Sequence, residues 1–286
     1  MARPASIVLA MAGIAVVTDA STCLPAALAA ALDIRVLPIS DTGELDDEPG
    51  GAGDTGWRLP ESVERAELGA ANRPFVTEYL AAIEEPGVEG AVVVTPAIEF
   101  AAMFRNAALA SELADRPAVA IDGRTAAAGQ ALVVLAGAEA AAKGGSLDDV
   151  VRAIESASHR VELVASLATL EPIRRNGPLP ESVLESRVRS GMRAVFRMRA
   201  GAVEMLGEAT DAAETLERIR QAYLESAGER GVERSTVFHA GAPDLAAHLE
   251  RLIGGVDFVS GFSTAMQVHT GRGVVGAAWL PRADAR

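Results

Sequence analysis

The chain has 286 residues, 49% of them hydrophobic and 23% charged, which is the balance of a globular protein with a sizeable core. A formal charge of −13, with no dense basic run, excludes the electrostatic footprint of a nucleic-acid-binding protein. No stretch reaches the roughly 18 consecutive apolar residues that a membrane span needs. The single cysteine, Cys23, can form no internal disulfide, so we expect a cytoplasmic protein.

The first part of the chain alternates short apolar runs with longer alanine-rich patterns, which predicts parallel strands joined by helices. Translation starts at Met1 or, alternatively, at Met11, and the apolar run before residue 18 is interpreted as a strand rather than a signal peptide. Ser146 and Asp149 predict a capping box. The predicted strands are 14–17, 35–39, 91–95 and 118–121, and the predicted helices are 25–32, 76–85, 98–113, 125–143 and one that starts near 147.

An acidic, glycine-rich segment at 42–56 interrupts this alternation. It has no apolar period and lacks the ligand spacing of a calcium loop, so we interpret it as a linker.

The pattern changes near residue 161, where strands at 161–166, 194–198 and 202–206 are predicted, the last two joined by a hairpin at 199–201. Helices at 211–226 and 243–253 follow, with a strand at 235–240 between them. We therefore expect an α/β protein with two α/β domains, 1–158 and 159–286, the first built on a mainly parallel sheet flanked by helices.

Familiar catalytic and metal-binding motifs are missing from the sequence. None of the four histidines pairs with another at i+2 or i+4, so no zinc site is predicted. There is also no G-x-S-x-G elbow, no Walker A lysine and no G-x-G-x-x-G that opens a helix after the first strand. We accordingly predict no catalytic residue, no metal and no cofactor.

Polar residues follow two of the predicted strands. Asp19 and Ser21 come after the strand at 14–17, where they either contact a ligand at the carboxyl end of a parallel strand or cap the turn and the next helix. Asp122 and Thr125 follow the strand at 118–121 and are interpreted as residues that satisfy backbone donors at a helix start.

A third segment, AMQVHTGRGVVG at 265–276, places His269 and Arg272 among three glycines. Glycines let a backbone approach a partner closely, and the imidazole and guanidinium are the strong donors nearby. The segment is either an anion-binding loop or a tight structural turn between two strands.

In their order and spacing these segments resemble the DegV family. VVTDASTCLP at 16–25 is similar to the family's V-T-D-S-x-x-D-L-P, AIDGRTAAAGQ at 120–130 to its I-D-S helix start, and VHTGRGVVG to its closing H-x-G-P-G-x-x-G. The resemblance covers roughly 14–279. It implies two α/β domains with a ligand tunnel between them that binds a long-chain fatty acid.

The resemblance further implies a protein that is not itself an enzyme and that presents the fatty acid to a separate kinase, with His269 contacting the carboxylate. Two hydroxyls that hold the carboxylate in the family are replaced here by Ala71 and Ala101. The glycine-arginine turn of the family is also altered, at 170–178. The predicted ligand contacts, which include donors that could replace these hydroxyls, are His269, Arg272, Asn72, Arg73, Arg105 and Ser21.

Three alternatives to fatty acid binding stay open. The protein binds another apolar ligand, or it is a phosphoryl-transfer enzyme with a fold like that of dihydroxyacetone kinases, or it is a divergent scaffold without a lipid ligand.

Overall fold

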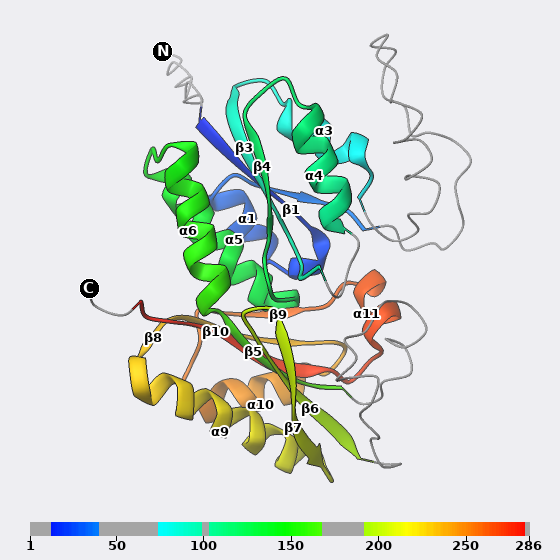
Figure 1. Cartoon of the computed structure of the whole chain (residues 1–286). Coiled ribbons are helices and arrows are strands. Elements are labelled where there is room, and N and C mark those ends of the chain that lie inside the picture. The colour runs from blue at the N-terminus through cyan, green and yellow to red at the C-terminus, as the bar shows by residue number, and fades with distance from the viewer. Residues whose placement is uncertain (1–12, 40–73, 99–102, 168–191, 284–286) are drawn as a thin grey trace, which may run out of the picture.

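Two β-sheets form the framework of the protein, and a layer of helices separates them (Figure 1). The computed structural model describes residues 13–39, 74–98, 103–167 and 192–283, apart from the side chains of residues 229, 230, 265, 268 and 269. The linker predicted at 42–56 and the altered turn at 170–178 lie outside the described residues. So does the choice between Met1 and Met11.

The first sheet, sheet A, is parallel throughout and has the strand order β2-β1-β3-β4. Its central strands are valine-rich and buried on both faces, as in parallel sheets covered by helices. All four predicted strands are confirmed with small shifts at their ends: β1 (Gly13–Asp19), β2 (Ile34–Leu37), β3 (Val88–Thr95) and β4 (Ala118–Asp122).

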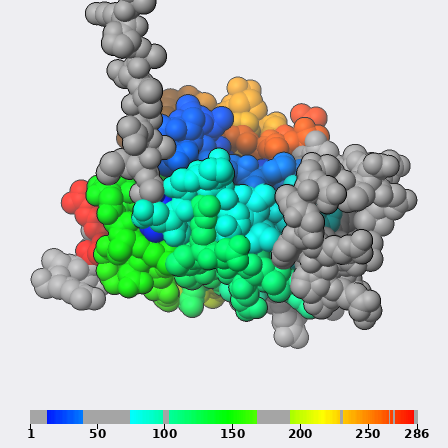
Figure 2. All heavy atoms as spheres, turned by 90° about the horizontal axis from the view of Figure 1, so that it is seen from above, coloured from blue at the N-terminus to red at the C-terminus, as the bar shows by residue number. Residues whose placement is uncertain are grey.

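Successive residues of β1 point to opposite faces of sheet A. Ala15 and Val17 pack against α3 and α4, whereas Val16 packs on the side of α5 and α6. From above, the elements before residue 160 make up most of the visible surface, in blue, cyan and green (Figure 2). The helical elements of this part are η1 (Ala20–Thr22), α1 (Ala26–Ala31), α3 (Val76–Ile83), α4 (Met103–Leu113), α5 (Ala127–Ala142) and α6 (Leu147–Arg160).

The helix predicted at 98–113 starts later than expected. Ile98 lies in a turn and is 49% exposed, and the described part of the helix begins at Met103. The predicted capping box is confirmed: Ser146 Oγ accepts from the Asp149 N–H, and the Asp149 carboxylate accepts from the Ser146 N–H.

Helix α5 lies between the two sheets and is buried on nearly all sides. A helix in this position needs apolar residues all around its circumference and small ones where neighbours approach. Gly137 meets that need, because a β-carbon there would lie 2.5 Å from Ile154 Cδ1 of α6.

The second sheet, sheet B, has the order β7-β6-β5-β10-β8-β9, with β8 and β9 parallel and the other pairs antiparallel. The predicted hairpin is confirmed: Ala200 and Gly201 both have positive φ, 49° and 86°, as in a type I′ turn. Strands β9 and β10 were not predicted. The strands are β5 (Glu162–Leu167), β6 (Arg193–Arg199), β7 (Ala202–Ala209), β8 (Val232–His239), β9 (Phe258–Gly261) and β10 (Val275–Pro281).

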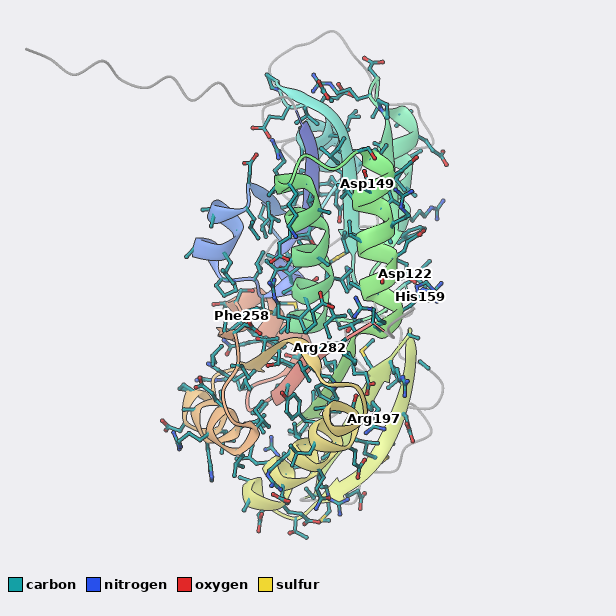
Figure 3. The ribbon with its side chains drawn as sticks, turned by 90° about the vertical axis from the view of Figure 1, so that its left-hand side faces the viewer. Asp122, Asp149, His159, Arg197, Phe258 and Arg282 are labelled. Carbon is teal, nitrogen blue, oxygen red and sulfur yellow. The ribbon has the colours of Figure 1, made fainter. Side chains whose placement is uncertain are left out.

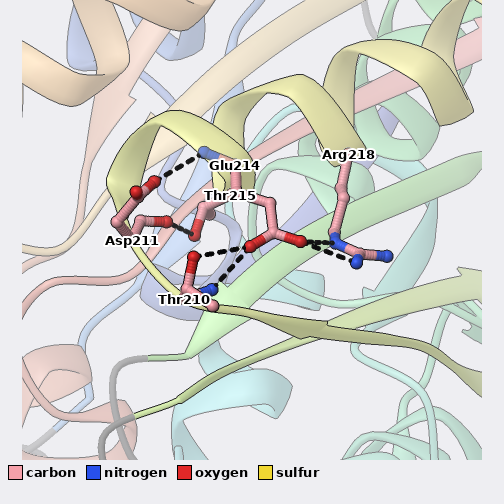
Figure 4. Close-up of polar contacts among 5 residues, drawn as sticks. All are labelled: Thr210, Asp211, Glu214, Thr215 and Arg218. Carbon is pink, nitrogen blue, oxygen red and sulfur yellow. Dashed lines mark hydrogen bonds and ion pairs between the residues drawn. The ribbon is translucent and has the colours of Figure 1, made fainter.

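Sheet B packs one face on α5 and the other on α9 (Ala212–Arg230) and α10 (Pro243–Ile253). At the start of α9, Asp211 Oδ1 accepts from the Glu214 N–H, and Glu214 in turn accepts from the N–H and hydroxyl of Thr210 (Figure 4). These bonds satisfy donors that a helix N-terminus leaves free, which is why α9 begins here.

The apolar core is continuous across the two sheets. One cluster includes Val16 and Val92 of sheet A, Leu132 of α5, and Phe238 and Leu280 of sheet B. The division into domains 1–158 and 159–286 therefore stays an interpretation, although sheet B begins at β5. Within the described residues, no helix has both the length and the apolarity to cross a membrane.

Candidate functional site

The carboxyl ends of the sheet A strands lie on the side of sheet B. Strands β1, β3 and β4 end at Asp19, Thr95 and Asp122, and in Figure 3 Asp122 lies near mid-height, between the upper and lower parts of the molecule. Ligands of open α/β sheets bind outside this edge.

A buried polar network follows the end of β1. The Asp19 carboxylate accepts from the Ser21 N–H at 2.9 Å and from Gln130 Nε2 at 3.4 Å, and the Ser21 hydroxyl donates to Gln130 Oε1 at 3.0 Å. Gln130 Nε2 also lies 3.1 Å from Thr18 Oγ1. Burial raises the pKa of Asp19, against the lowering effect of its hydrogen bonds to Ser21 and Gln130. The network ties the first strand to α5.

Of the two interpretations of this segment, the structure shows the capping contact: Asp19 is the N-cap of η1, and the Ser21 hydroxyl already has an acceptor inside the protein. Ligand binding by Ser21 stays a prediction. Sequence reasoning missed Gln130 because its partners lie more than a hundred residues away along the chain.

Asp122 and Thr125, the second polar segment, are interpreted from the sequence as residues that satisfy backbone donors at a helix start, and the structure shows this for only one of them. Asp122 Oδ1 accepts from the Arg124 N–H at 2.8 Å, as expected of a capping residue. The Thr125 side chain satisfies no backbone donor of the helix start, because its buried Oγ1 has no hydrogen-bond partner. The expected capping role of Thr125 is therefore wrong.

The closing segment connects a helix to a strand rather than two strands. His269 lies in α11 (Thr264–Thr270), and the chain turns at Gly271 and Gly273, with φ of 79° and 85°, before it enters β10. Gly276 lies within β10, where a β-carbon would come within 2.4 Å of Phe238 Cζ. The alternative of a turn between two strands is therefore wrong. The sequence did not indicate α11 because this helix is short and its pattern of three apolar residues in seven is weak. The side chain of His269 lies outside the described part of the structure.

Two of the remaining predicted donors lie within the described chain. Arg272 is exposed, and its guanidinium lies across Gly241, where a β-carbon would be 3.0 Å from Arg272 Nε. Arg105 is exposed in the first turn of α4. Asn72 and Arg73 lie outside the described residues. So do Ala71 and Ala101.

Arg193 is a residue near the closing segment that sequence reasoning missed. At the start of β6 it donates from Nη2 to the carbonyl of Gly273 at 2.5 Å and from Nε to the hydroxyl of Ser166 at 3.3 Å. Partial burial lowers its pKa. Arg193 thus fixes the turn that precedes β10.

Helix α11 contacts the carboxyl edge of sheet A through apolar side chains. Met266 packs with Ala20 of η1, Ile39 after β2 and Met103 of α4. The segment that carries His269 therefore adjoins the edge at which a ligand of sheet A is expected. Within the described residues, no group of three or more histidine, cysteine, aspartate and glutamate side chains could hold a metal ion.

The geometry defines a class: a two-sheet α/β protein with an apolar contact between the carboxyl edge of its parallel sheet and a late helix. A family model described as "Uncharacterised protein, DegV family" matches residues 13–282, so the chain belongs to the DegV family. A DegV domain-containing protein of Streptomyces coelicolor is 26% identical over 273 residues, which are 92% of this chain and 96% of that protein.

Solved structures have the same fold. A DegV family protein of Corynebacterium glutamicum aligns with a TM-score of 0.75 at 20% identity, over 97% of this chain and all of that one. A DegV family protein of Thermus thermophilus, described by its fatty acid binding, aligns with a TM-score of 0.74 at 23% identity, over 94% of this chain and all of that one. The predicted family and fold class are confirmed.

Proposed function

We propose that this chain binds a long-chain fatty acid between the carboxyl edge of sheet A and the part of the molecule that carries α11. Membership of the DegV family over residues 13–282, with a structural neighbour described by fatty acid binding, is the observation that carries the proposal. The apolar contact of Met266 with Ile39 and Met103 supports it, because a hydrocarbon chain requires such walls.

The binding energy of such a ligand comes from its tail. Each buried methylene contributes about 0.8 kcal/mol, so a long acyl chain supplies on the order of 10 kcal/mol before the costs of association. The carboxylate adds little net affinity but must be hydrogen-bonded, because a buried anion without donors is strongly destabilised. Specificity for an acid therefore depends on a few polar groups.

In this role the chain itself catalyses no reaction. The bound acid is presented to a separate kinase, which transfers a phosphoryl group to the carboxylate. The absence of a predicted nucleophile or nucleotide-binding motif in the sequence is in keeping with this role. A single cysteine, Cys23, is in keeping with a reducing cytoplasm as the place of action.

Native mass spectrometry of the purified protein tests the proposal. We expect a bound mass equal to that of a fatty acid, either co-purified or taken up from added oleate. A protein that remains free of lipid after incubation with oleate would contradict it. In parallel, ATP and magnesium are added to the protein alone, and hydrolysis of the ATP would favour the phosphoryl-transfer alternative.

Two variants test the predicted contacts of the closing segment. His269→Ala and Arg272→Ala are each expected to weaken oleate retention, with the larger effect at His269 since the Arg272 side chain is exposed. Arg251→Ala, a change at an exposed arginine of α10, serves as the control. Retention by both variants equal to that of the control would remove the closing segment from the site.

A further inference from the structure

Five hydroxyl side chains lie at the carboxyl edge of sheet A in the described chain, and four of them are already used. A ligand carboxylate needs a donor that has no acceptor inside the protein. The four occupied hydroxyls donate as follows: Thr18 to the carbonyl of Val94, Ser21 to Gln130 Oε1, Thr22 to the carbonyl of Asp19, and Thr95 to the carbonyl of Pro96.

The fifth hydroxyl belongs to Thr125 and has no partner, although the residue is only 1% exposed. A buried hydroxyl without an acceptor destabilises the folded state unless something binds it. Its oxygen points at the first turn of α5, since it lies 2.3 Å from where a β-carbon on Gly129 would be. The glycine leaves the room that the hydroxyl occupies.

The same turn presents free backbone donors. Helix α5 has 16 residues, and its N-cap, Ala126, has no side chain that could accept a hydrogen bond. Within the described chain, the N–H groups of Ala127 and Ala128 have no acceptor, and both residues are buried. Unpaired N–H groups and the helix dipole make such a terminus attractive to an anion.

We propose that the Thr125 hydroxyl and the first turn of α5 bind the carboxylate of the fatty acid. This inference rests on the proposed function and names the head-group site within it. One carboxylate oxygen accepts from the Thr125 hydroxyl, and the other accepts from the backbone N–H groups of the turn. Two oxygens with several lone pairs match this set of donors, whereas an alcohol head group matches only part of it.

Thr125 is tied to the connection that follows β3. Its carbonyl accepts from the Ala97 N–H at 2.7 Å. This bond holds Thr125 at the carboxyl edge of sheet A.

The test is Thr125→Val, which replaces the hydroxyl by a methyl group of similar size. Dissociation constants of the delipidated protein for oleate and for oleyl alcohol are measured by native mass spectrometry. We expect oleate to bind about 10- to 100-fold more weakly to the variant, the range for a hydrogen bond to a charged group, and oleyl alcohol to bind within about threefold of the unchanged protein. The ligand-free variant is expected to unfold at a higher temperature, because it no longer buries an unpaired hydroxyl.

Two further variants complete the test. Thr125→Ser keeps the hydroxyl and should retain most of the preference for oleate. Thr95→Val removes a buried hydroxyl that already donates to Pro96 and should leave that preference unchanged. If the unchanged protein binds oleate and Thr125→Val binds it equally well, the head-group site is wrong while the proposed function stands. If the unchanged protein binds no oleate, both fail.

Discussion

Gly276 near the start of β10 has no room for a side chain, and Gly276→Ala tests this directly. A β-carbon there would lie 2.4 Å from Phe238 Cζ, 2.7 Å from the carbonyl oxygen of Val164 and 2.9 Å from Ala165 Cβ. All three distances are shorter than atoms of these kinds tolerate. The phenylalanine ring can shift, but the Val164 carbonyl belongs to β5, which pairs with β10, and cannot retreat without loss of sheet pairing.

Overpacking in a tight core costs typically 1–3 kcal/mol, and the contact with fixed backbone places Gly276→Ala at the upper end, about 3 kcal/mol. For a chain of this size that corresponds to a fall in melting temperature of about 6 °C. Urea unfolding followed by circular dichroism measures the loss as a lower midpoint with an unchanged slope.

Gly228 in α9 supplies a matched control, since nothing lies within 4 Å of its β-carbon position and its φ is not positive. The same chemical change there, Gly228→Ala, is expected to raise stability by up to about 1 kcal/mol, because alanine favours helix. We therefore expect the two glycine-to-alanine changes to alter the free energy of unfolding in opposite directions. A Gly276→Ala protein as stable as the unchanged one would refute the packing of β10 between β5 and β8.

Three other changes follow from the polar contacts. Ser226→Ala removes a hydroxyl that accepts from Trp279 Nε1 and donates to the buried Glu162, at 3.0 Å each. The free energy of unfolding in urea should fall by about 2 kcal/mol, and an unchanged value would contradict these two hydrogen bonds. Burial raises the pKa of Asp19 above its unfolded value, so the stability that this residue contributes is lost as the pH rises from the unfolded pKa through the folded one. Asp19→Asn should flatten this fall in stability, and parallel pH profiles of the variant and the unchanged protein would count against it. Hydrogen bonds to Thr210 and Arg218 lower the pKa of Glu214 from 4.5 to about 2. Glu214 therefore adds to the free energy of unfolding above pH 4.5, and this stabilisation is lost as the pH falls towards 2. Glu214→Gln should make the loss of stability in acid smaller, as measured by unfolding curves at several pH values.

Much of sheet A could be predicted from the sequence because its signals are local. Valine-rich runs such as 91–95 predict buried strands, and the serine-to-aspartate spacing at Ser146 predicts a helix start, independently of the rest of the chain. The hairpin at Ala200 and Gly201 belongs to the same group, since a short turn with a glycine between two apolar runs is a local signal.

Strand β10 could not be predicted because its residues fit the strands on either side of it, β5 and β8, rather than a local strand pattern. Gly276, Ala277 and Ala278 have weak strand propensity, yet they pair with β5 and β8. At Gly276, the ring of Phe238 and the carbonyl of Val164 leave no room for a side chain. The contacts of the candidate site could not be predicted for the same reason, since they depend on residues far apart in the sequence. That the Ser21 hydroxyl is occupied and the Thr125 hydroxyl is not depends on Gln130 and on backbone carbonyls brought close only by folding.

The central position of β10 also affects how the protein forms during synthesis. Without residues 275–281, no strand of the described chain joins β7-β6-β5 to β8-β9, and each of these two groups would expose a hydrogen-bonding edge that β10 covers in the complete sheet. Premature release of the nascent chain before this point would yield a product prone to pairing with other copies, so the last strand acts as the closing step of assembly.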